Sequence, residues 1–313
     1  MGRLVGRGVM SHGWAAAILL LVSLAPSLAA AQEARLKAVA TFSILADLVA
    51  QVGGDRVTVT SLVGPDADAH GYSPAPGDAR QVAEANLVVV NGLGFEGWLE
   101  RLIKASGTKA PVVVASKGVK TIAGSHDHDD HGHAHGEGDH ADPHAWQNVA
   151  NVKLYVANIR DGLSAADPAH AGLYAANAAA YSAKLDALDA EIRAELAKIP
   201  EERRRIITTH DSFGYFSAAY GMRFLAPQGV STDSEAGPKD VARIIRQIRR
   251  DKVPAVFVES IADPRLMQQI ARESGAKVGG RIYSDALSAP GGPAPGYLEM
   301  MRANLTAFRE ALS

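Results

Sequence analysis

Short apolar runs alternate with stretches of helical length in the first part of the chain. Residues 57–63 alternate β-branched and polar positions, whereas residues 87–90 and 112–115 are continuous apolar runs, typical of strands buried on both faces of a parallel sheet. The pattern predicts strands at 36–42, 57–63, 87–90 and 112–115 and helices at 44–52, 78–85 and 94–105. This alternation of strand and helix predicts a doubly wound α/β lobe.

A long amphipathic stretch follows, and it predicts one rigid helix that joins two lobes. Asp167-Pro168 is typical of a helix start, with a capping side chain followed by proline at the first helical position, and Pro200 ends the pattern. Apolar side chains recur at helical spacing at Leu173, Tyr181, Leu185, Leu188, Ile192, Leu196 and Ile199. At roughly 1.5 Å per residue the helix would be about 45–50 Å long.

The alternation of strand and helix then resumes, which predicts a second doubly wound lobe. The expected strands are 205–209, 256–258 and 277–283, and the expected helices are 212–220, 240–252, 264–274 and 297–312. The chain is therefore expected to divide into an N-terminal lobe (32–167), a linking helix (168–199) and a C-terminal lobe (200–313).

The first 31 residues are expected to be a cleaved signal peptide. Arg3 and Arg7 give a basic start, residues 14–24 are apolar but too short to span a membrane comfortably, and Ala29-Ala30-Ala31 is a small-residue cleavage site. The alternative is an N-terminal membrane anchor, which the missing stop-transfer flank disfavours. The chain has no cysteine for a lipid anchor. These features predict a soluble periplasmic protein.

Composition adds one strong feature, the uneven spread of histidine. The 313 residues carry a formal net charge of −2, which gives no electrostatic reason to expect nucleic acid or an anionic membrane as partner. Residues 124–142 lack apolar periodicity and predict a mobile loop. Such a loop is a solvated linker or, because histidine-rich tracts bind metal, a set of weak metal sites. The candidate auxiliary sites are His126, His128, His131, His133, His135 and His140.

Four isolated side chains lie where ligands bind in open α/β sheets. His70, His210 and Asp285 follow predicted strands, and His144 lies in Asp-Pro-His-Ala-Trp after the histidine-rich loop. Any one of these histidines is more simply explained as a structural, hydrogen-bonded residue. As a set, imidazole nitrogen and carboxylate oxygen suit a divalent metal, zinc above all, in a cleft between the lobes.

These residues also carry a family resemblance. The chain resembles the cluster A-I periplasmic solute-binding proteins, which serve ABC importers of zinc and manganese. The matching segments are 68–74 (DAHGYSP), 86–98 (NLVVVNGLGFEGW), 142–146 (DPHAW), 210–216 (HDSFGYF) and 258–264 (VESIADP). The resemblance implies that His70, His144, His210 and Asp285 are the metal ligands and that a membrane permease is the partner.

The resemblance also bears on the choice of metal. Members that resemble manganese carriers have a carboxylate at the third ligand position, where this chain has His210, so the resemblance implies the zinc-specific branch. Asp285 could bind through one oxygen or two. Some zinc carriers of the family have a disulfide in the second lobe, which this chain lacks.

Four acids near the ligands are candidate supports. Asp68, Asp142 and Asp211 are near ligand histidines and could fix a ring tautomer, or they could equally cap turns. Glu235 is a candidate for closing the cleft, although a loop acid ordinarily faces water.

The sequence therefore predicts a monomeric periplasmic zinc-binding protein that captures Zn²⁺ and delivers it to an ABC permease, with a zinc metallochaperone as a further candidate partner. The alternatives are a manganese carrier of the same family and a periplasmic zinc buffer or chaperone. A zinc hydrolase with Asp285 as base is disfavoured, because the sequence has no His-Glu-x-x-His and no nucleophile motif.

Deleting residues 125–140 is expected to leave one tight zinc site and to remove weaker ones. Each ion bound in this segment has to offset the entropy of ordering a chain with too few apolar residues to hold one geometry. Zinc titration counts the tight and the weak sites. The rate of zinc transfer from a chelator shows whether the deletion slows loading. Loss of the tight site, with the circular dichroism spectrum unchanged, would contradict the prediction.

Overall fold

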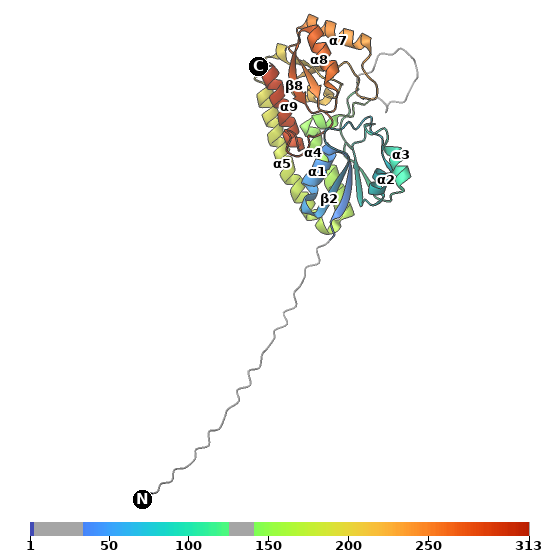
Figure 1. Ribbon diagram of the computed structural model, residues 1–313, viewed down its shortest axis with the longest axis vertical. Helices are drawn as coiled ribbons and strands as arrows, with labels where there is room; N and C mark the ends of the chain where they lie inside the picture. Colours follow the sequence, from blue (N-terminus) through green and yellow to red (C-terminus); the bar gives the residue numbers. More distant parts are fainter. Residues whose placement is uncertain (3–33, 125–140, 313) are drawn as a thin grey trace. The chain divides into compact units, whose positions relative to one another are not determined.

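The N-terminal lobe is built on a parallel sheet with the strand order β2-β1-β3-β4, as the alternating pattern predicted (Figure 1). The computed structural model describes residues 1–2, 34–124 and 141–312 of the chain. The elements of this lobe are β1 (Leu36–Phe42), α1 (Ser43–Gly53), η1 (Gly54–Arg56), β2 (Val57–Val63), α2 (Pro76–Ala83), β3 (Leu87–Val90), α3 (Leu99–Ser106) and β4 (Val112–Val114).

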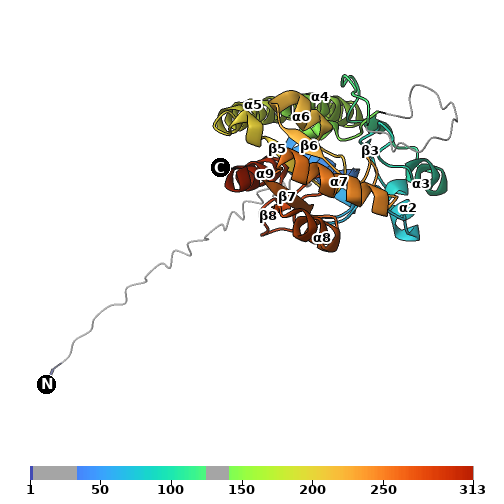
Figure 2. The ribbon, with the colours of Figure 1, turned by 90° about the horizontal axis from the view of Figure 1, so that it is seen from above.

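The C-terminal lobe repeats this plan with the parallel order β6-β5-β7-β8. Seen from above, helices lie on both sides of the strands, so the doubly wound architecture is confirmed (Figure 2). The elements are β5 (Arg205–Ile207), α6 (Gly214–Tyr220), β6 (Arg223–Leu225), α7 (Pro238–Asp251), β7 (Ala255–Glu259), α8 (Pro264–Ser274), β8 (Lys277–Ile282) and α9 (Tyr297–Leu312).

One long helix joins the lobes, as the pattern predicted, and a second helix precedes it along the chain. The connecting elements are η2 (Ala145–Gln147), α4 (Val149–Ala166), η3 (Pro168–His170), α5 (Ala171–Leu196) and η4 (Glu201–Arg203). Helix α5 is the expected long helix, shortened because its first turn is the separate 3-10 turn η3. It packs against α1 and α4 of the first lobe and against α6 and α9 of the second.

Helix α4 was missed by the sequence analysis. Its buried side chains do recur at helical spacing, but Val149, Val152 and Val156 are β-branched and Gly162 lies inside the helix, which lowers helix propensity. Gly162 is needed there because a Cβ at this position would collide with Val113 of β4. The helix therefore gains its stability from close packing on the sheet.

The prediction that β4 is buried on both faces was wrong. Strand β4 lies at the edge of its sheet, and Val112 and Val114 are 43% and 39% exposed. A continuous apolar run cannot distinguish an edge strand from a central one, because it contains no polar position. Strand β6, only three residues long, also had no sequence signal.

Sequence-encoded caps fix several helix ends that were predicted correctly. In α8 the Asp263 side chain accepts the backbone N–H of Arg265, Pro264 occupies the first helical position, and Gly275 ends the helix at a φ of 83°. These signals explain why the bounds of α8 agree with the pattern.

A single large core runs through both lobes. It joins β1 and α1 to α5 and, beyond them, to β7 and α9, while a smaller core lies between α7, α8 and β7. Arg35 and the residues after it form one compact unit. The division of the chain at residues 167 and 200 stays a prediction.

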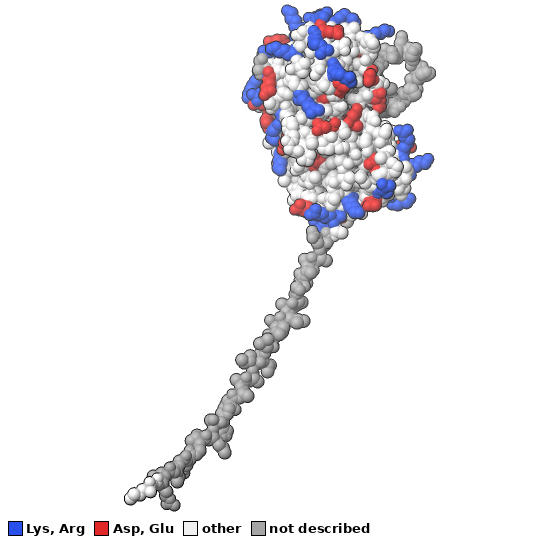
Figure 3. Space-filling model, in the orientation of Figure 1, with Lys and Arg blue, Asp and Glu red and all other residues white. Residues whose placement is uncertain are grey.

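The predicted signal peptide and the six auxiliary histidines fall outside the described residues, except for Met1 and Gly2. In the described part of the chain, no helix has both the length and the apolar content needed to cross a bilayer. Basic and acidic side chains are interspersed over the face in Figure 3.

Candidate metal centre

Three of the four sequence-predicted donors, all except His144, follow parallel strands along the chain. His70 is in the segment after β2, His144 directly precedes η2, His210 follows β5, and Asp285 follows β8. Both lobes therefore direct their strand ends, and with them the donors, to the same buried place. All four residues are buried, with at most 7% of their surface exposed.

The His70 segment is held by side chains of its own lobe. The Asp68 carboxylate accepts the backbone N–H of His70 at 2.9 Å, and the Trp98 indole donates to the carbonyl oxygen of Ala69 at 2.8 Å. Phe95 packs against the His70 ring, with ring centroids 4.6 Å apart. These contacts set the position of the imidazole without using its Nε2 atom.

His144 is held by Asp142 on one side and by the second lobe on the other. The Asp142 carboxylate lies 2.7 Å from Nδ1 of His144 and also accepts its backbone N–H. The next residues reach the other lobe, because the side chains of Trp146 and Gln147 both donate to the carbonyl oxygen of Ser284, each at 2.9 Å.

His210 is held by an acid that the sequence analysis did not single out. Glu259, the last residue of β7, lies with Oε2 2.5 Å from Nδ1 of His210, and its Oε1 accepts the backbone N–H of His210 at 2.9 Å. The available signal was a single acid at the end of an otherwise apolar strand, Ala-Val-Phe-Val-Glu. Glu259 is fully buried.

The donor atoms of the four residues converge within 4.8 Å of one another. Nε2 of His144 lies 3.2 Å from Nε2 of His70 and 3.3 Å from Nε2 of His210. The Asp285 carboxylate completes the group, with Oδ2 3.1 Å from Nε2 of His210 and 3.3 Å from Nε2 of His70.

The ring tautomers make this convergence unfavourable without a cation. A carboxylate beside Nδ1 draws the ring proton to that atom, which leaves Nε2 of His144 and of His210 with a lone pair. These lone pairs face each other and the Asp285 oxygens, neither of which has a hydrogen-bond partner among the described residues. A proton or a metal cation between them removes the repulsion.

The pKa values follow from the same arrangement. Burial lowers the pKa of His144, but the attraction of Asp285 and the contact with Asp142 outweigh it and raise this pKa to about 9. Burial is likewise outweighed at His210, whose pKa is raised by Glu259 and Asp285. Burial would raise the pKa of Asp285, yet His210 and His144 hold it well below its usual value.

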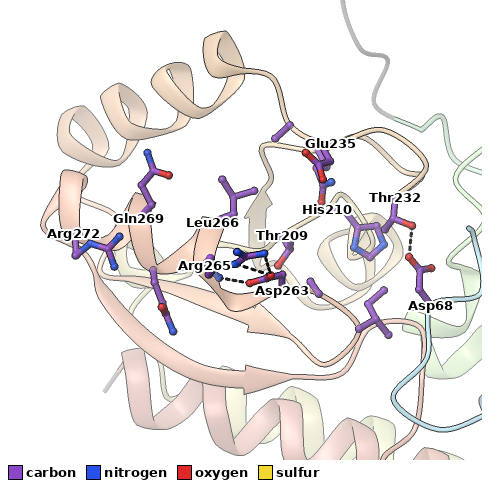
Figure 4. Close-up of a pocket in the computed structure, with 15 residues that line it drawn as sticks. Asp68, Thr209, His210, Thr232, Glu235, Asp263, Arg265, Leu266, Gln269 and Arg272 are labelled. Carbon is purple, nitrogen blue, oxygen red and sulfur yellow. Dashed lines mark hydrogen bonds and ion pairs between the residues drawn. The ribbon is translucent and has the colours of Figure 1, made fainter.

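A pocket of about 700 Å³ opens beside His210 (Figure 4). Asp68 of the first lobe and Thr232 of the second meet at its edge, where the Thr232 hydroxyl donates to the Asp68 carboxylate at 2.6 Å. Glu235 also lines the pocket and is exposed, as expected for a loop acid. The pocket borders the donor cluster at His210, the one ligand among its lining residues.

The predicted supporting acids divide into three cases. Asp142 is confirmed as the partner of a histidine ring, whereas Asp68 contacts the backbone of His70 and not its ring. The predicted role of Asp211 as a ring partner was wrong, because in the described part of the chain its carboxylate forms no hydrogen bond or ion pair with His210. The carboxylate nearest to Nδ1 of that ring is Glu259, at 2.5 Å.

Comparison with known proteins agrees with this fold and site. The family model described as zinc-uptake complex component A, periplasmic, matches residues 38–311. The manganese-binding lipoprotein MntA of Halalkalibacterium halodurans is 35% identical over 278 residues, covering 89% of each chain. The iron-binding protein YfeA of Yersinia pestis is 34% identical, covering 85% of this chain and 83% of the relative.

Solved structures agree as well. The periplasmic zinc binding protein TroA from Treponema pallidum has a TM-score of 0.81 at 29% identity, covering 89% of this chain and 99% of that one. A manganese-bound mutant of the periplasmic metal binding protein from Candidatus Liberibacter asiaticus has a TM-score of 0.79 at 31% identity, covering 89% and 100%.

The fold and the buried donor cluster thus define a metal-binding solute-binding protein of an ABC importer, a class of binding proteins and not of enzymes. The chain belongs to the family of the periplasmic zinc-uptake component A. A membrane permease is the partner that this class implies.

The metal-free protein is expected to lose stability as the pH rises from about 6.5 to 9. The pKa of His144 is raised from 6.5 to about 9, so its contribution is complete below pH 6.5 and is lost as the pH passes through 9. A shift of this size corresponds to about 3 kcal/mol. Thermal melts of chelator-treated protein from pH 6 to 9.5 test this, and a constant melting temperature would contradict it.

Proposed function

We propose that this protein is a high-affinity periplasmic zinc carrier, which captures Zn²⁺ with His70, His144, His210 and Asp285 and delivers it to the permease of an ABC importer. The observation that carries the proposal is the convergence of three imidazole Nε2 atoms and one carboxylate in a buried seam between two lobes. The ion is the cargo of the site, and the four side chains are its ligands.

The spacing of the donors supports a tetrahedral ion. Donors about 2.0–2.1 Å from a tetrahedral zinc ion are separated from one another by roughly 3.3–3.4 Å. The Nε2 of His144 is 3.2 and 3.3 Å from the other two Nε2 atoms, and Asp285 Oδ2 is 3.1 Å from that of His210. The cluster is therefore already close to the dimensions that zinc requires.

The chemistry of the donors supports zinc over manganese. Three imidazoles and one carboxylate form a nitrogen-rich, four-donor set, whereas manganese favours more oxygen donors and a higher coordination number. The second oxygen of Asp285 also faces inward, 3.6 Å from Nε2 of His144, and offers a fifth contact. Aromatic side chains (Phe42, Phe95 and Trp146) pack around the cluster and reduce the access of water.

A manganese carrier of the same family is the alternative, and the names of the relatives give it weight. MntA and several streptococcal relatives are named for manganese and YfeA for iron, while TroA is named for zinc. A periplasmic zinc buffer or chaperone remains a further alternative, distinguished by whether the loaded protein stimulates the ATPase of the importer.

Metal analysis of the purified protein, dialysed against equal zinc and manganese, tests the choice of metal. We expect one zinc per chain. Alanine variants of His70, His144, His210 and Asp285 should each lose well over tenfold in zinc affinity by calorimetry, because even the loss of a residue behind a ligand costs about 10–100-fold.

The matched control for these variants is His170→Ala, which removes a histidine that pairs with Asp167 outside the cluster. It is expected to bind zinc as the parent does. If three of the four ligand variants also bind like the parent, the site is misassigned, and if dialysis leaves manganese in place of zinc, the alternative holds.

Replacing Thr232 by valine is expected to speed zinc release, since it removes the hydroxyl that joins the second lobe to Asp68 and, through Asp68, to the backbone of His70. The hydrogen bond is half-buried, so the effect on the dissociation rate should be roughly three- to tenfold. Thr232→Ser keeps the hydroxyl and serves as the control. Equal rates for the two variants, measured by transfer to excess chelator, would contradict the role given to this contact.

A further inference from the structure

Glu259 contacts the ring of His210 and also three other groups of the metal centre. One oxygen, Oε1, accepts the backbone N–H groups of Thr209 and His210 at 2.7 and 2.9 Å. The other, Oε2, lies 2.5 Å from Nδ1 of His210 and accepts the hydroxyl of Ser284 at 2.7 Å. Both oxygens of this fully buried carboxylate are therefore engaged by segments that carry ligands.

Through Ser284, Glu259 also contacts the segment that carries a second ligand, Asp285. Ser284 directly precedes Asp285, so the carboxylate that holds the His210 ring also holds the segment that presents Asp285. The carbonyl of Ser284 in turn accepts the side chains of Trp146 and Gln147, which follow His144. Three of the four donor segments are thus linked through one chain of buried hydrogen bonds and contacts that starts at Glu259.

We propose that Glu259 is a positioning residue that sets the metal selectivity of the centre, by holding His210 as an Nε2 donor in register with Asp285. The inference rests on the proposed zinc site and deepens it. A carboxylate behind an imidazole fixes the proton on Nδ1, orients the ring and makes Nε2 a stronger donor. Each of these effects benefits the ion that depends most on nitrogen donors.

Without Glu259, the metal selectivity is expected to change because the centre loses His210 as a nitrogen donor. If the His210 ring carries its proton on Nε2, it no longer binds the ion, and two imidazoles and the Asp285 carboxylate are left. That set has a larger share of oxygen donors and an open position for water, which costs zinc more than it costs manganese. Glu259 is therefore expected to change the ratio of zinc affinity to manganese affinity, and not only the strength of metal binding.

Glu259→Gln is the informative substitution. The side-chain carbonyl of glutamine can still accept the two backbone N–H groups, and the Ser284 hydroxyl, which loses its acceptor, can turn to accept from the new amide group. Its amide nitrogen, however, is a donor and takes the place of Oε2, where it meets Nδ1 of His210. The ring then has to accept at Nδ1 and carry its proton on Nε2, which faces the other donors.

The first lobe offers a matched control in Glu96. This buried acid accepts the Thr41 hydroxyl and the backbone N–H of Asn91, each at 2.6 Å, and the backbone N–H of Gly92 at 3.2 Å. It lies after β3, which occupies the position in its sheet that β7 occupies in the other. It binds backbone as Glu259 does, but in the described part of the chain no hydrogen bond or ion pair joins it to His70, His144, His210 or Asp285.

The experiment measures zinc and manganese affinities, the melting temperature without metal, and the absorption spectrum with Co²⁺ for the parent, Glu259→Gln and Glu96→Gln. We expect zinc affinity to fall about 10–100-fold in Glu259→Gln, the range for the loss of a residue behind a ligand. Manganese affinity should fall much less, so that the zinc-to-manganese ratio drops at least about tenfold. The intense tetrahedral Co²⁺ bands should weaken, and Glu96→Gln should keep both the ratio and the spectrum.

The outcomes separate this inference from the proposed function. If the parent itself does not prefer zinc, the proposed function fails and this inference fails with it. If the parent prefers zinc but Glu259→Gln keeps its ratio and Co²⁺ spectrum, or if Glu96→Gln changes them equally, only the role of Glu259 is overturned.

A second variant decides the question if Glu259→Gln does not fold. Ser284→Ala removes the hydroxyl that holds Oε2 and leaves both acids in place. Because it loosens the carboxylate without reversing the donor at Nδ1, it should lower the same ratio by roughly threefold, a cost of less than 1 kcal/mol. An unchanged ratio in Ser284→Ala would overturn the proposal.

Discussion

The structure depends on one electrostatic constraint, the close approach of acceptor atoms that need a proton or a metal cation between them. Nε2 of His144 lies 3.2 and 3.3 Å from those of His70 and His210, and the Asp285 oxygens face the same point without partners. Such an arrangement is unfavourable in a buried seam unless a cation neutralises it. Everything around the cluster, from Asp142 and Glu259 to the strand ends, holds these atoms in place against that repulsion.

The fold and the four donors could be predicted because their signals are local. Strand and helix periodicities identify a doubly wound lobe, and a polar residue after a buried strand lies at the edge where ligands bind. Three of the donors lie in the segments that follow such strands, and His144 lies in a short motif before η2. The limits of α8 were also predictable, since Asp263, Pro264 and Gly275 are recognised start and stop signals.

The remaining features depend on which strands become neighbours, and no local pattern contains that information. Glu259 reaches His210 because β7 pairs with β5, two strands separated by about fifty residues of chain. The exposure of β4 likewise follows from its place at the edge of the sheet and not from its three valines. Helix α4 is rich in β-branched residues and is stabilised by the sheet beneath it, so its propensity gave a weak signal.

The continuity of the large core determines how an ion can leave. Apolar side chains of both lobes and of α5 and α9 share one interior, so swinging the lobes apart would bring buried apolar surface into water at about 25 cal/mol per Å². Exposing even a few hundred square ångströms would cost several kcal/mol. Residues 228–236, several of which line the pocket, are half-buried or exposed, so their movement exposes much less apolar surface. The timing of delivery is therefore expected to reside in local fluctuations of surface segments, while the body of the protein remains a stiff frame.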